Sequence, residues 1–165
     1  MKRFDKIVEE WATIYKPMQH TPGDTGKNRR FFLFDSIVSI PQFSGKLDST
    51  KSPCIGFEFH KQGNIVGGKA MPVYTIYFLV NVGTMNLTEK NRSADAVAEA
   101  ELHAHKFLAW IQNEQENRPE LRNIDLNNVV YDTYGPLMNN WYALFLQFKD
   151  VDVFNVCVDK NDYVE

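Results

Sequence analysis

Residues 54–82 read CIGFEFHKQGNIVGGKAMPVYTIYFLVNV, and this stretch decides the fold. Residues 54–61 and 73–82 are rich in β-branched and aromatic side chains, which predicts two strands. Apolar residues occupy both faces of the second strand, as is typical of a central strand covered on both sides. Between the strands, four turn-forming residues predict a protruding β-hairpin with a wide loop: Gly63, Asn64, Gly67 and Gly68.

Two helices flank this strand region in the sequence. In residues 4–15 the apolar positions recur every three or four residues, which predicts a short amphipathic helix that ends before Pro17. A longer helix is expected from Ser93, as its N-cap, to about Glu116. At about 100° per residue its core stripe comprises Val97, Ala100, Ala104, Leu108 and Ile111.

The other segments complete an α+β pattern. We expect exposed loops at residues 16–30 and 41–53, and an extended segment at 30–40, although so short an apolar run does not distinguish strand from helix. A closing strand pair is expected at residues 129–134 and 141–148, and residues 150–158 alternate as in a strand with one wet face. The sequence therefore predicts a single α+β domain over residues 1–165: a mainly antiparallel sheet, a protruding hairpin, one long helix packed on the sheet, a short N-terminal helix, and a C-terminal tail at 159–165.

Composition narrows the class of protein. The chain of 165 residues is 44% hydrophobic and 13% aromatic, which is enough apolar area for one globular core. A net charge of −3 provides no basic field for a phosphate backbone, so we expect no direct nucleic-acid affinity. No signal peptide and no membrane span are recognisable, which predicts a cytoplasmic protein with no membrane partner. Cys54 and Cys157 have no metal or redox spacing and are expected to be buried free thiols. A disulfide between them requires their Cα atoms to lie within about 7 Å, which the sequence does not show.

The loop TPGDTGKN, residues 21–28, superficially suggests a phosphate-binding loop. The motif requires Gly where this chain has Thr21, and Ser or Thr where it has Asn28. It also requires a preceding strand, whereas a helix is predicted before this loop. We therefore expect no nucleotide site.

Residues 99–105, EAELHAH, concentrate possible metal ligands on the long helix. His103 and His105 diverge on a helix, so only the pairs Glu99/His103 and Glu101/His105 share a face, and a zinc site needs three or four ligands. The four histidines form no recognisable nucleophile motif. Asp150 and Asp152 are two apart on a predicted strand and could form an acid pair, but simple exposure at a strand end explains them equally well. The sequence thus predicts no catalytic, cofactor-binding or metal residue.

Trp110 breaks the pattern of the long helix. Helical projection places it with Glu99, His103 and Lys106, opposite the core stripe. An aromatic residue on a polar face often anchors a partner interface. A loop of the same chain that covers the ring is an equally good explanation. The interface candidates are therefore Trp110, His103, Lys106 and the hairpin tip of Gly63, Asn64, Gly67 and Gly68.

The closing stretch GPLMNNWYALFLQFKDVDVF, residues 135–154, is a turn followed by an aromatic-led strand. Together with the order helix, long loop, hairpin, helix and strand pair, it resembles the tail-terminator and minor-tail families of long-tailed bacteriophages. The resemblance implies a structural protein, without turnover or cofactor, that forms a homohexameric ring on the tail tube and meets the head connector. It also implies a location in the host cytoplasm and the virion tail.

Two other classes of function remain open. A stand-alone enzyme or small-ligand module would carry a polar group buried on the helix-facing side of the sheet, with His60 or Tyr74 as candidates. A dimeric interaction protein would bind peptides along exposed strand edges.

Overall fold

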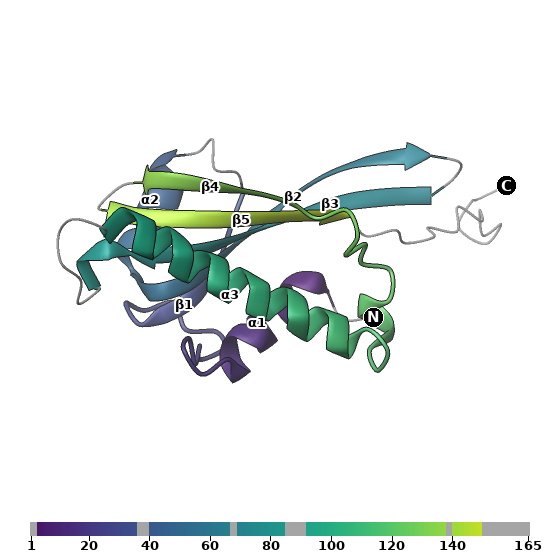
Figure 1. Cartoon of the computed structure of the whole chain (residues 1–165), viewed down its shortest axis with the longest axis horizontal. Helices are drawn as coiled ribbons and strands as arrows, with labels where there is room; N and C mark the ends of the chain where they lie inside the picture. The colour runs from purple at the N-terminus through teal and green to yellow at the C-terminus, as the bar shows by residue number, and fades with distance from the viewer. Residues whose placement is uncertain (1–2, 36–39, 67–68, 85–91, 138–139, 150–165) are drawn as a thin grey trace, which may run out of the picture.

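The computed structural model describes residues 3–35, 40–66, 69–84, 92–137 and 140–149. Five strands form one mixed sheet in the order β1-β2-β3-β5-β4 (Figure 1). Only the β1/β2 pair is parallel. In chain order, the helices and strands of the described residues are α1 Phe4–Ile14, β1 Arg29–Phe34, α2 Ile40–Asp48, β2 Thr50–Val66, β3 Lys69–Asn81, α3 Arg92–Glu114, β4 Val130–Leu137 and β5 Trp141–Lys149. Short 3-10 turns lie at Val82–Thr84 and Pro119–Leu121.

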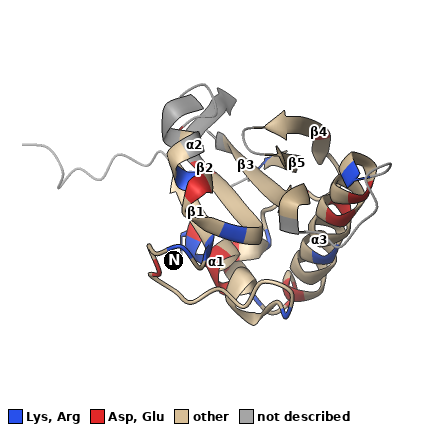
Figure 2. Cartoon of the chain, turned by 90° about the vertical axis from the view of Figure 1, so that its left-hand side faces the viewer, with Lys and Arg blue, Asp and Glu red and all other residues tan. Residues whose placement is uncertain are grey.

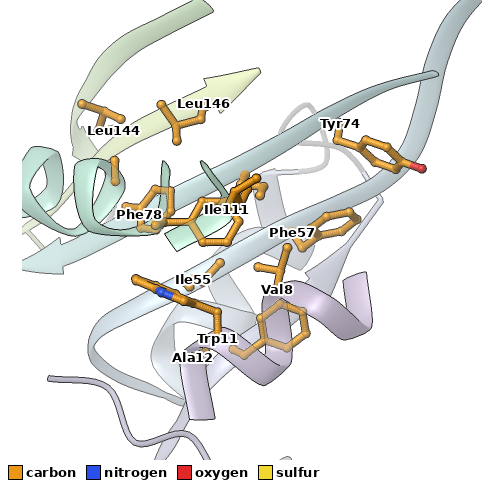
Figure 3. Packing of buried hydrophobic residues seen from close by; sticks show 14 of the residues in the cluster. Val8, Trp11, Ala12, Ile55, Phe57, Tyr74, Phe78, Ile111, Leu144 and Leu146 are labelled. Carbon is orange, nitrogen blue, oxygen red and sulfur yellow. The ribbon is translucent and has the colours of Figure 1, made fainter. Parts of the chain in front are cut away.

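The described residues confirm the predicted α+β class. Helices α1 and α3 cover one face of the sheet, and α2 packs on the other face (Figure 1). On the first face, Val8 and Trp11 of α1 point at the sheet toward Ile55 and Phe57 (Figure 3). No helix among the described residues is long and apolar enough to cross a membrane.

Strand β3 is central, as its sequence predicts. Tyr74, Ile76 and Phe78 join the core under α1 and α3, whereas Tyr77 and Leu79 join the core on the α2 side. Because alternate side chains of a strand point to opposite faces, one strand contributes to both cores.

The hairpin of β2 and β3 protrudes beyond the rest of the sheet (Figure 1). The last pair between β1 and β2 is Phe34 with Glu58, and the last pair between β5 and β3 is Lys149 with Val73. Beyond these points β2 and β3 pair with no other strand of the described residues, and their own pairing continues out to Val66 and Lys69. We call this projecting part, residues 62–66 and 69–73, the arm.

The wide loop expected in this hairpin was wrong. Gly63 pairs with Pro72 and Asn64 with Met71, so both belong to the strand ladder of the arm. The other two residues of the predicted tip, Gly67 and Gly68, lie outside the described residues.

The loop expected at residues 41–53 was also wrong, because α2 occupies most of it. Phe43 and Leu47, four residues apart, share one helix face and are buried in the core of the second sheet face. Buried Arg29 on β1 fixes the end of this helix: its guanidinium donates to the Lys46 carbonyl at 2.7 Å and to the hydroxyl of Ser49. The segment expected to be extended is confirmed as strand β1 up to Phe34, and residues 36–39 lie outside the described part.

Helix α3 forms where it was predicted, with its buried face turned slightly from the expected stripe. Ala100, Ala104 and Ile111 are buried as expected, whereas Val97 and Leu108 are only half-buried. The other buried positions are Ala96, His103 and Phe107. Ser93 lies inside the first turn rather than before it, and its hydroxyl lies 2.7 Å from that of Tyr142 on β5. The closing strand pair is confirmed as β4 and β5.

Candidate functional site

The densest group of buried polar side chains surrounds the C-terminal half of α1. His103 is 3% exposed and His20 is 3% exposed, and each lies within reach of a glutamate and of a residue from another element. The prediction of an exposed loop at residues 16–30 was therefore partly wrong, because Met18 and His20 of this loop are buried.

Tyr15, His103 and Glu99 form a chain of polar contacts between α1 and α3. The Tyr15 hydroxyl lies 2.9 Å from Nδ1 of His103, and Nε2 of the same ring lies 3.4 Å from Oε1 of Glu99. A carboxylate can only accept a hydrogen bond, so the neutral imidazole carries its proton on Nε2 and accepts from the Tyr15 hydroxyl at Nδ1. Burial lowers the pKa of His103, opposed by Glu99, so the ring is neutral at neutral pH.

This order of hydroxyl, imidazole and carboxylate is that of a nucleophile–base–orienter relay. Burial first, and Glu99 second, raise the pKa of the Tyr15 phenol, which is the opposite of what an activated nucleophile needs. The Tyr15 ring also stacks on Trp11 at a centroid distance of 4.3 Å. The relay therefore keeps the phenol protonated and holds the end of α1 against α3.

His20 and Glu9 form the second buried group. The Arg30 backbone amide donates to Nδ1 of His20 at 3.2 Å, and Nε2 lies 3.6 Å from Oε1 of Glu9. Glu9 also accepts from Lys6 Nζ at 2.8 Å and from the Gly23 amide at 3.4 Å. Both ring nitrogens of His20 are thus engaged within the fold, which leaves none to act on a substrate.

The two pairs predicted on one face of α3 are observed, at 3.4 Å for His103–Glu99 and 4.0 Å for His105–Glu101. Among the residues that the structure describes, no group of three or more His, Cys, Asp or Glu could hold a metal ion. Asp150, Asp152 and Cys157 lie outside those residues. Cys54 is a buried free cysteine, and burial raises the pKa of its thiol far above the usual range.

The loop at residues 21–28 follows helix α1 and precedes strand β1, the reverse of a phosphate-binding loop. The amide of Gly26, which such a loop would aim at a phosphate, donates instead to Oδ1 of Asp24 at 2.7 Å.

The interface candidates on α3 have different environments. Trp110 is half-buried: its ring centroid lies 6.2 Å from that of Phe107, and the Arg118 guanidinium lies 5.2 Å from the same Trp110 centroid. His103 is buried, because Tyr15 reaches it from α1, and Lys106 is exposed. Both signs of charge occur along α3 (Figure 2), and its acidic residues outnumber its basic ones: Asp95, Glu99, Glu101 and Glu114 against Arg92 and Lys106.

Strand β4 is the surface that the sequence analysis missed. Residues 130–136 are all exposed, and Val130, Tyr131 and Tyr134 are among its large hydrophobic side chains. Tyr134 stacks on Phe145 of β5 at 5.4 Å, on the face of the sheet where α2 packs farther along. The sequence signal was VYDTY, in which aromatic residues fall on both faces of an edge strand.

The open edge of β4 is protected against strand addition. Oδ1 of Asp132 accepts the backbone amide of Thr133 at 2.8 Å, and Pro136 has no amide hydrogen to donate. A partner on β4 would therefore contact side chains rather than extend the sheet.

None of the known protein families, curated proteins and solved structures compared with the chain matches it.

Proposed function

We propose that this chain is a structural protein that works as a homo-oligomeric ring, resembling the tail terminators of long-tailed bacteriophages. In that role it caps the tail tube and joins it to the head connector. The observation that carries the proposal is the arm of β2 and β3, which projects beyond both neighbouring strands.

The arm needs support from outside its own sheet. Beyond Glu58 strand β1 no longer pairs with β2, and beyond Val73 strand β5 no longer pairs with β3 in the described part of the chain. An isolated two-stranded hairpin is at best marginally stable in water. Its outer edges also present amide and carbonyl groups that favour pairing with another chain. A neighbouring subunit, or the tube beneath, supplies that support in a ring.

The exposed side chains of β4 provide a second contact surface. Tyr131 is 64% exposed and Val130 is 56% exposed, on a strand at the far edge of the sheet from β1. Tyrosine is enriched at protein interfaces because its ring is large and its hydroxyl tolerates water.

The test is the molar mass in solution of the whole chain and of a variant without the arm. Light scattering of the parent should give about six copies of the 19.1 kDa chain, alone or with tail tubes added as a template. In the variant, an Asn-Gly turn replaces residues 63–72, so that Gln62 and Val73 still face each other. The variant should fold, as shown by circular dichroism, and fail to form the ring. Gln112→Ala, at an exposed position of α3 outside the interface candidates, is the control and should form the ring as the parent does.

The second candidate function, a small-ligand module, is favoured by the Tyr15–His103–Glu99 relay, because it puts the buried His103 imidazole, flanked by two half-buried polar side chains, on the side of the sheet that α1 and α3 cover. It predicts a monomer at all concentrations and with tubes present. It also predicts that Tyr15→Phe abolishes ligand binding while the arm-less variant retains it.

A further inference from the structure

We propose that His20 is an acid-sensitive latch, which holds residues 15–28 against the outer edge of β1 and releases them when its imidazole is protonated. This proposal does not depend on the oligomeric assembly proposed above. The latch joins three parts of the fold: its own segment, Glu9 on α1 and the Arg30 amide on β1.

The hydrogen-bond partner at Nδ1 makes the latch sensitive to acid. The Arg30 backbone amide is a donor and can never accept, so its 3.2 Å bond requires an unprotonated Nδ1. The proton of the neutral ring must then lie on Nε2, toward Glu9. A second proton places an N–H at Nδ1 directly against the Arg30 N–H. One bond is lost and two donors face each other in a buried place, which forces the ring away from β1.

His103 provides the contrast within the same molecule. Its Nδ1 also accepts, but from the Tyr15 hydroxyl at 2.9 Å. A hydroxyl can turn and accept from a protonated ring, so acid removes no bond there. Protonation at His103 is opposed by burial, whereas at His20 it is opposed by burial and by the fixed direction of a backbone amide.

The charges around His20 act in both directions. Glu9 on α1 and Asp24 in the loop favour the imidazolium. Lys6 Nζ lies 2.8 Å from Glu9 and offsets part of its negative charge. On the β1 side the imidazole ring lies 5.9 Å from the Phe31 ring, which carries no charge. Burial dominates and lowers the pKa of His20 below its ordinary 6.5.

The direction of the pH effect follows from this shift. The unfolded chain binds the proton near pH 6.5 and the folded chain binds it only at lower pH, so the unfolded state gains the proton first. The stabilisation by neutral His20 is therefore complete above the unfolded pKa. It decreases as the pH falls below 6.5, until the folded pKa is reached.

Release has a defined structural consequence. The segment carries Met18, which is 2% exposed and belongs to the core, and it is tied to α1 through the His20 amide and the Ala12 carbonyl at 3.0 Å. When the imidazole leaves β1, the Arg30 amide on this edge strand loses its hydrogen-bond acceptor, and Met18 becomes exposed to water with the released segment.

The experiment compares His20→Asn with His105→Asn in the full chain. The side-chain oxygen of asparagine occupies the position of Nδ1, so it can accept the Arg30 amide and cannot titrate. His105 is exposed and lies on the same helix as His103, which makes its replacement a matched control. Urea unfolding is measured from pH about 7.5 to about 5 for the parent and both variants.

We expect the folding equilibrium constant of the parent to fall faster with acid than that of His20→Asn. The difference should approach about tenfold per pH unit below 6.5, the limit for one linked proton. His105→Asn should follow the parent. Equal pH dependence in the parent and in His20→Asn would overturn the latch.

A measurement on the parent protects the test against a variant that does not fold. Nitrogen and carbon chemical shifts of the His20 ring should show the Nε2–H tautomer at neutral pH and a pKa below 6.5. The amide signal of Arg30 should move with the same transition. An Nδ1–H tautomer, or a pKa at or above 6.5, would also refute the proposal.

Discussion

Replacing Trp110 by alanine distinguishes a side chain that serves its own fold from one that serves a partner. The ring is half-buried, with the Phe107 ring at 6.2 Å and the Arg118 guanidinium at 5.2 Å from its centroid. Arg118 is held in place by Glu10 at 2.7 Å and by Glu114 at 2.8 Å. The Arg118 side chain, which follows α3 in the sequence, therefore covers part of the Trp110 ring.

The magnitude follows from this burial. Truncation of a fully buried aromatic residue to alanine costs about 3 to 5 kcal/mol, so a half-buried one costs about 2. The cation–π contact adds about 0.5 to 1 kcal/mol. We expect Trp110→Ala to lower the free energy of unfolding by roughly 2 to 3 kcal/mol, and the melting temperature by about 5 to 10 °C.

Urea unfolding followed by circular dichroism measures the loss without relying on tryptophan fluorescence. A double-mutant cycle with Arg118→Ala should give a coupling of about 0.5 to 1 kcal/mol, because the two side chains are in contact. Leu102→Ala, an exposed position on the same helix, is the control and should change stability by less than about 0.5 kcal/mol. A loss below about 1 kcal/mol in Trp110→Ala, accompanied by weaker association, would refute the intramolecular explanation and assign the ring to an interface.

Three further substitutions test particular contacts. Tyr15→Phe removes the donor to Nδ1 of buried His103 and should cost about 1 to 3 kcal/mol in thermal or urea unfolding; an unchanged stability would show that water replaces the phenol. Gly135→Ala should destabilise by about 1 to 3 kcal/mol, because Gly135 has φ +155° and an added Cβ would lie 2.3 Å from the Tyr142 ring; tolerance would mean that this ring moves freely. Asp132→Ala uncovers the edge amide beside it and should increase aggregation measured by light scattering, with stability changed by less than about 0.5 kcal/mol; equal aggregation would show that the carboxylate does not protect the edge.

The fold was predictable where one local period dominated. The strands around Ile76 and Leu144 follow from runs of β-branched and aromatic side chains between turn-forming residues. The long helix α3 follows from apolar residues that recur at a helical interval. Helix α2 was missed because Gly45 and the neighbouring serine and proline residues are typical of loops. Only Phe43 and Leu47 indicated a buried helix face, and two apolar residues are too few to identify a helix.

The polar sites were less predictable, because they depend on contacts between distant segments. Helical projection placed His103 on the polar face of α3, opposite the predicted core stripe. Its burial depends on Tyr15, which is 88 residues earlier in the chain and arrives only when α1 docks. His20 lies in a segment that is polar by composition, and the one backbone amide that holds its ring belongs to β1. No spacing in the sequence reports either pairing.

The hydrogen bonding of buried polar side chains bears on the choice between assembly and ligand binding. Among the described residues, no buried side-chain nitrogen or oxygen lacks a hydrogen-bond partner. Catalysis and ligand binding usually require a polar group held ready for a molecule from outside, and here His20, His103 and Glu9 are already engaged with other parts of the fold. Within the described residues, the arm pairs with no strand outside its own hairpin, and Val130 and Tyr131 of β4 are largely exposed. Both are suited to contact with another protein chain, which is why assembly rather than chemistry is the function to test first.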